Sequence, residues 1–149
     1  MTTADWLVDD SLAPSTTDEQ LGELYRGSAR GELVLPFCPA CDLALELEQV
    51  VCDRCGAAGP VWRQAAPHGR VHSVTVVHRL EPGLVRTRDP YPVADIELAC
   101  GHRVVLAPLE PGAAPPAIGD TVSIGFRRIG DTAVPSFRSE VFPPTKESR

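Results

Sequence analysis

The 149-residue chain has few of the features that mark membrane, nucleotide-binding or nucleic-acid-binding proteins. No apolar run approaches the length that spans a bilayer, and no glycine-rich phosphate loop is present. Aromatic residues make up only 5%, and the formal net charge is −6. Single-stranded nucleic acid binds to aromatic side chains in a basic groove, so this composition disfavours that function. The apolar content of 43% is nevertheless enough for a folded core.

Two further absences concern the compartment and the basic residues. The chain begins Met1-Thr2-Thr3-Ala4-Asp5, without the basic and apolar regions of a secretory leader. We therefore expect a cytoplasmic protein, in which disulfides are rare. Lysine is scarce beside arginine, which is typical of bidentate binding to phosphates or carboxylates and equally of a GC-rich genome.

Four of the five cysteines form two Cys-x-x-Cys pairs. The pairs are Cys38-Pro39-Ala40-Cys41 and Cys52-Asp53-Arg54-Cys55, and the second is followed by Gly56. Each pair can place two sulfurs on one tight turn, and two such turns together form a tetrahedral site of four thiolates. The spacing therefore predicts a structural zinc site whose ligands are Cys38, Cys41, Cys52 and Cys55.

Other interpretations of the cysteines are a second metal, disulfides and redox chemistry. Iron is the main alternative, because four thiolates also bind iron, and the spacing alone leaves zinc and iron open. Two disulfides conflict with the expected compartment, and a redox function fits one pair better than two matched pairs. Four cysteine ligands imply no vacant coordination position, so the metal is expected to hold structure.

The N-terminal third is predicted to contain a tail and a helix. Residues 1–17 are small, polar and acidic, and we interpret them as a flexible tail with Trp6 as one anchoring aromatic. A helix is predicted within residues 18–31, where two capping-box patterns precede an apolar stripe that includes Leu21 and Leu24. This stripe is expected to contact the core, or else a partner protein.

The remaining chain is predicted to be mainly β. Residues 32–63 form the zinc ribbon, in which the alternation over residues 43–48 predicts a strand. Residues 64–142 contain five alternating stretches separated by turn signals such as Gly101 and Gly130-Asp131. Five mostly antiparallel strands in about eighty residues predict an OB-type barrel. A charged tail is expected at 143–149.

This order of features resembles the OB-fold family with an N-terminal rubredoxin-like zinc ribbon, known as an acyl-CoA-associated domain of unknown function. The ribbon followed by the strand Gly69-Arg70-Val71-His72-Ser73-Val74-Thr75-Val76-Val77 is the most specific part of the resemblance. The other matching segments are Gly31-Glu32-Leu33, the two cysteine pairs, Trp62, Tyr91–Leu98, Ile118–Val122 and Pro135–Arg138. One departure is Cys100-Gly101, at a turn where the family often has an acidic residue before glycine.

The resemblance implies a non-catalytic accessory subunit with no activity alone. Members of the family pair with thiolase-like proteins in thiolase, acyltransferase or retro-aldolase complexes, some of them in steroid side-chain breakdown. For this chain the resemblance implies a heteromeric complex with a thiolase-like protein and an acyl-CoA ester at a shared interface. The alternative functions are an OB-fold nucleic-acid-binding protein and an iron-bearing electron carrier.

Arg86 and Arg88 are the candidate residues for contact with CoA. They lie on a loop between prolines, from which arginines can donate charge-assisted hydrogen bonds to the phosphates of CoA. The competing interpretation is a solvated loop with a local pair between Arg88 and Asp89.

No catalytic residues are predicted. Cys100 and His102 lie too close along the chain to indicate a dyad, and we interpret Cys100 as a small buried apolar residue. Asp95 and Glu97 share a strand face, and a polar barrel surface explains them better than acid–base chemistry. The histidines at positions 68, 72 and 78 lack the further ligand that a second metal site needs.

Overall fold

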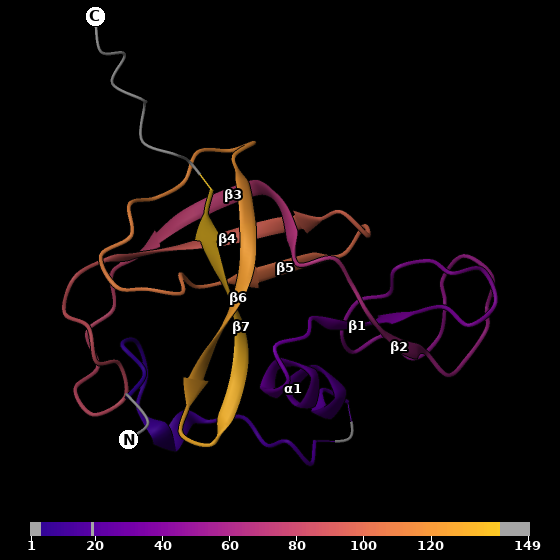
Figure 1. Cartoon of the computed structure of the whole chain (residues 1–149), viewed down its shortest axis with the longest axis horizontal. Coiled ribbons are helices and arrows are strands. Elements are labelled where there is room, and N and C mark those ends of the chain that lie inside the picture. Colours follow the sequence, from indigo (N-terminus) through magenta and orange to yellow (C-terminus); the bar gives the residue numbers. More distant parts are fainter. Residues whose placement is uncertain (1–3, 19, 141–149) are drawn as a thin grey trace, which may run out of the picture.

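The computed structural model describes residues 4–18 and 20–140 (Figure 1). The described strands form two sheets, one of two strands and one of five. The smaller sheet belongs to the region of the cysteine pairs, which projects from one side of the larger sheet in Figure 1. The tail predicted at 143–149 lies outside the described residues.

The larger sheet is a five-stranded barrel, as the sequence predicted. Its strands are β3 (His68–Val77), β4 (Tyr91–Leu98), β5 (Arg103–Leu106), β6 (Thr121–Ile129) and β7 (Thr132–Ser139). Their order across the sheet is β5-β4-β3-β6-β7, and all four pairings are antiparallel. A parallel bridge between Pro108 and Phe137 brings the chain after β5 against β7, on the opposite edge.

The alternating sequence of β4 explains how the barrel obtains its core. Ala94, Ile96 and Leu98 are buried, whereas Glu97 on the opposite face is exposed. Successive side chains of a strand point to opposite faces, so this alternation directs one face inward. Gly69 of β3 is needed where two strands approach closely, since a Cβ there would lie 2.4 Å from a carbonyl oxygen of β4.

The two sharp turns predicted from glycine are present. Gly130 and Asp131 connect β6 to β7, with Ile129 paired to Thr132, and Gly130 has a φ of +57°. Gly101, with a φ of +101°, lies in the turn from β4 to β5. Glycine adopts positive φ without the steric cost that other residues incur.

Helix α1 (Gly22–Ala29) lies against β7 and the short strand β1 (Val34–Phe37), which pairs with β2 (Val61–Gln64). The helix is shorter than the 18–31 expected. Asp18, rather than a capping box, begins the preceding turn, because its carboxylate accepts the N–H groups of Gln20 and Leu21 at 2.8 Å. Glu19, part of the expected capping box, lies outside the described residues.

The strand predicted over residues 43–48 is wrong. That segment forms only an isolated bridge between Ala44 and Phe37. The backbone is instead used to close a tight turn, with Cys38 N–H donating to the Leu43 carbonyl and Leu45 N–H to the Pro36 carbonyl. The alternation reflects burial of Leu45 against the cysteines, and not an extended strand.

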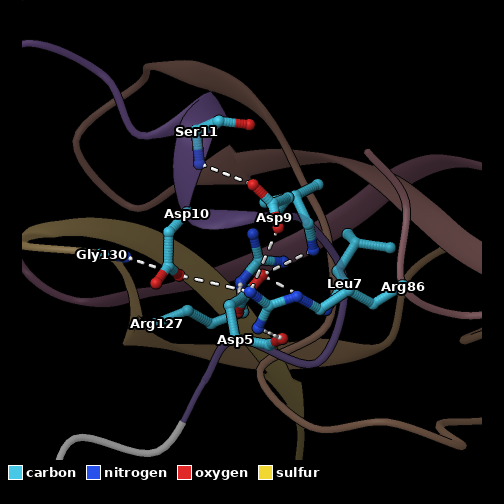
Figure 2. A network of polar contacts seen from close by, with 9 residues as sticks. Asp5, Leu7, Asp9, Asp10, Ser11, Arg86, Arg127 and Gly130 are labelled. Carbon is cyan, nitrogen blue, oxygen red and sulfur yellow. Dashed lines mark hydrogen bonds and ion pairs between the residues drawn. The ribbon is translucent and has the colours of Figure 1, made fainter. Parts of the chain in front are cut away.

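Residues 4–17 differ from the flexible tail that the sequence predicted. Leu7 is buried, and Val8 forms an antiparallel bridge with Val85. The side chain of Asp5 is only 2% exposed and forms an ion pair with Arg127, 3.2 Å away and itself 8% exposed (Figure 2). The segment is therefore a layer of the fold, and sequence reasoning missed it because its partners lie far along the chain.

Candidate functional site

The four predicted ligand cysteines come together at the tip of the ribbon. Their sulfur atoms all lie within 4.8 Å of one another. The Cys38–Cys55 and Cys41–Cys52 sulfur distances are 3.5 and 3.7 Å. A tetrahedral zinc with Zn–S bonds of about 2.3 Å requires sulfurs roughly 3.8 Å apart. The donor set and its size therefore fit a metal of this kind.

Each cysteine pair is held by a turn that ends in a residue of positive φ. The N–H of Asp42 donates to the Cys38 carbonyl, and the N–H of Gly56 donates to the Cys52 carbonyl. Asp42 and Gly56 have φ values of +64° and +78°. Aspartate tolerates this conformation better than most residues other than glycine. Its carboxylate also pairs with Arg63 of β2.

Local hydrogen bonds prepare one of the sulfurs for ionisation. The N–H groups of Cys41 and Ala40 both donate to the Cys38 sulfur at 3.4 Å, and they lower the pKa of Cys38 to about 6. At Cys55 the Ala57 N–H lowers the pKa of the thiol. The hydrogen bond with Cys38 and burial act in the opposite direction and together raise the pKa to about 12. A divalent cation would remove this conflict, because it binds all four sulfurs as thiolates.

The ribbon is fixed to the barrel immediately beside the first cysteine. Phe37 lies against the ring of His102, with centroids 4.9 Å apart, and the guanidinium of Arg63 lies 4.1 Å above the Phe37 ring. His102 Nε2 is 2.7 Å from the Pro36 carbonyl. Sequence reasoning missed this junction, because no local pattern links the β4–β5 turn to the ribbon. The only signal in the sequence was His102, two residues after Cys100, the cysteine that lies outside the two Cys-x-x-Cys pairs.

Arg86 and Arg88 line one depression of about 480 Å³, together with Asp9, Leu80 and other residues of the loop. Arg86 is already engaged there: its guanidinium donates to the Asp5 carbonyl at 2.9 Å and lies 3.6 and 3.5 Å from the carboxylates of Asp9 and Asp10 (Figure 2).

Arg88 differs from Arg86 in its partners. It forms no ion pair within the described part of the chain, so the local pair expected with Asp89 is not formed there. Of the two arginines, Arg88 therefore has the guanidinium that internal carboxylates leave available for an anion.

Asp95, one of the two carboxylates considered from the sequence, is engaged by an arginine of the neighbouring strand. Asp95 forms two hydrogen bonds with Arg103, which hold the pKa of that carboxyl below its usual range. Within residues 4–18 and 20–140, the cysteine cluster is the only group of three or more histidine, cysteine or acidic side chains placed to share a metal. None of the helices described has the length and apolar character that crossing a membrane requires.

Comparison with known proteins agrees with this architecture. Residues 62–127 match the family model described as the C-terminal OB-fold domain of ChsH2. The chain is also similar to a chain of the solved structure Ltp2-ChsH2(DUF35) aldolase. The two are 26% identical, the similarity covers 86% of this chain and 100% of that one, and the TM-score is 0.72. No curated protein matches the chain. Residues 62–127 are therefore similar to the C-terminal OB-fold domain of ChsH2, and in this chain they follow a four-cysteine ribbon.

Proposed function

We propose that the chain is a non-catalytic accessory subunit that binds and stabilises a thiolase-like acyl-CoA enzyme in the cytoplasm. The observation that carries this proposal is the similarity to a chain of the Ltp2-ChsH2(DUF35) aldolase, which extends over ribbon and barrel together. The partner's reaction belongs to the thiolase, acyltransferase or retro-aldolase class that the family resemblance implies. A four-cysteine cluster without disulfides suits a reducing compartment.

The metal proposed at the cysteine cluster is structural zinc. A closed set of four thiolates leaves no position for substrate, so the metal would hold the ribbon in shape. The tip of the ribbon needs such support, because the cluster of buried residues around the cysteines consists of Cys38, Leu45 and Cys52. Elemental analysis of protein purified in air should find one zinc per chain and no colour. A red protein with stoichiometric iron would contradict the assignment and favour the electron carrier.

The acyl-CoA ester is proposed to contact this chain at the loop that carries Arg86 and Arg88. Arg88 supports the idea, since it has no internal carboxylate partner in the described chain, whereas Arg86 is committed to Asp9 and Asp10. Arg88→Glu should therefore weaken acyl-CoA binding by the complex. Arg86→Glu should do so only as a consequence of releasing the N-terminal segment. Unchanged affinity in both variants would remove CoA from this loop.

The accessory role can be tested by affinity purification of the tagged chain from its own host, followed by mass spectrometry. We expect a thiolase-fold protein in stoichiometric amount, and acyl-CoA conversion by the complex but not by this chain alone. The tag without the chain is the control. Recovery of nucleic acid without a protein partner would contradict the proposal and favour the nucleic-acid-binding alternative, which a gel-shift experiment at low salt would then check.

A further inference from the structure

The turn from β4 to β5 brings together a thiol and an imidazole that the sequence did not suggest as a pair. The sulfur of Cys100 lies 3.2 Å from Nδ1 of His102. Gly101, between them, has a φ of +101°, and this sharp reversal lets side chains only two residues apart meet. The Leu98 N–H donates to the His102 carbonyl at 2.8 Å and closes the turn.

The hydrogen bond on the other side of the ring determines which nitrogen carries the proton. His102 Nε2 lies 2.7 Å from the carbonyl oxygen of Pro36. A carbonyl oxygen can only accept, so Nε2 must be the protonated nitrogen. In the neutral ring, Nδ1 then presents its lone pair to Cys100, and the S–H group donates to it. This is the arrangement of a nucleophile, a base and a group that orients the base.

The surroundings keep this arrangement in place. His102 is 5% exposed and packs edge-on against Phe37. Burial lowers the pKa of His102, although the hydrogen bond to Pro36 opposes the shift, so the ring stays neutral and able to accept a proton. Cys100 packs against the core but is only partly buried, whereas His102 is buried.

We propose that Cys100 is a nucleophilic thiol, activated by His102, that accepts an acyl group from an acyl-CoA thioester. The sulfur attacks the thioester carbonyl while His102 Nδ1 takes the thiol proton. The C–S bond to CoA then breaks, and the proton passes from Nδ1 to the departing CoA sulfur. The products are S-acylated Cys100 and free CoA, with no oxidant or reductant required. The choice of acyl-CoA as donor rests on the proposed function, whereas the activated thiol does not.

Cys100 is chemically separate from the other cysteines. The metal cluster contains Cys38, Cys41, Cys52 and Cys55, and Cys100 is not part of it. Sulfurs bound to a metal react more slowly than a free activated thiol, so labelling of the metal-loaded chain should report on Cys100. Exchange between two thioesters is nearly balanced in energy, so excess acyl-CoA should drive acylation and excess free CoA should reverse it.

The test compares the metal-loaded wild-type chain with two variants of the base. In His102→Gln the side-chain amide can still donate to the Pro36 carbonyl, but it offers no basic nitrogen to Cys100. His102→Ala removes both functions, and Cys100→Ser is the control without a nucleophile. Each protein is incubated with iodoacetamide or with acetyl-CoA, and the adduct is located by peptide mass spectrometry. The melting temperature is recorded in parallel.

We expect wild-type Cys100 to react with iodoacetamide at least tenfold faster than glutathione, and to become acetylated by acetyl-CoA. His102→Gln should lose at least tenfold in both rates at an unchanged melting temperature, since general-base assistance contributes about 10²–10⁴-fold. Equal rates in wild type and His102→Gln would overturn the activation by His102. Rapid alkylation of Cys100 without acetylation would overturn the proposal that Cys100 accepts an acyl group from a thioester. All measurements use the isolated chain, so a failure to find a thiolase-like partner would leave their outcome unaffected.

Discussion

The buried ion pair between Asp5 and Arg127 allows a direct test of whether the N-terminal segment belongs to the fold. Asp5→Asn keeps the shape of the side chain and an oxygen that can accept from the N–H groups of Leu7 and Val8. It removes the negative charge 3.2 Å from Arg127. Burial already lowers the pKa of Arg127, and the charge of Asp5 opposes that shift. The variant would therefore leave a buried cation without its counter-charge.

The expected loss follows from the burial of both partners. Removing one member of a buried ion pair costs about 3–5 kcal/mol of unfolding free energy. At about 2–4 °C per kcal/mol for a chain of this size, the melting temperature should fall by roughly 6–20 °C. Scanning calorimetry or circular dichroism at pH 7 measures this shift directly.

The matched control is Asp10→Asn in the same segment. The side chain of Asp10 is 60% exposed and pairs with Arg86, so its charge is worth only about 0–1 kcal/mol. Adding Arg127→Met to Asp5→Asn should restore much of the lost stability, because the pair is then replaced as a unit. If Asp5→Asn costs no more than Asp10→Asn, the argument that the segment is held by a buried charge pair fails.

Three further changes test the metal centre, the barrel and its surface charges. Cys52→Ser should lower the bound metal per chain at least tenfold by elemental analysis, whereas Cys100→Ser should leave the metal content unchanged. Gly69→Ala should lower the unfolding free energy in urea by about 1–3 kcal/mol, because its Cβ would lie 2.4 Å from a carbonyl oxygen of β4. Arg103 lowers the pKa of Asp95 in the folded protein. Ionised Asp95 therefore stabilises the fold at any pH above its unfolded pKa of about 3.9, and this stabilisation is lost as the pH falls through the pKa of the folded state. The difference in unfolding free energy between wild type and Asp95→Asn should therefore stay below about 1 kcal/mol at pH 7 and vanish toward pH 2. A difference that does not change with pH would contradict this reasoning.

The features that the sequence predicted correctly depend on short-range patterns. Two Cys-x-x-Cys pairs close their own turns, so the spacing is sufficient to bring Cys38 and Cys55 together once the ribbon folds. Alternation along β4 and the Gly130 turn likewise involve neighbours in sequence. These patterns were enough to predict the barrel and the cluster of possible ligands.

The features that the sequence did not predict depend on partners far along the chain. Arg86 was a candidate for phosphate binding, yet its carboxylate partners are Asp9 and Asp10, more than seventy residues earlier. The Cys100–His102 pair was dismissed because the two residues are close in sequence. It was the Pro36 carbonyl, 66 residues away from His102, that gave the pair a defined orientation.

The long separation between Asp5 and Arg127 has a consequence for synthesis of the protein. The ribosome produces Asp5 first, but the guanidinium that neutralises it is not made until more than a hundred residues later. Until then, the N-terminal segment can form its bridge with Val85 but lacks the buried charge pair that completes its docking. Docking of the first residues is therefore expected to be a late folding step, and a product that terminates before Arg127 would expose a segment for chaperones or proteases to recognise.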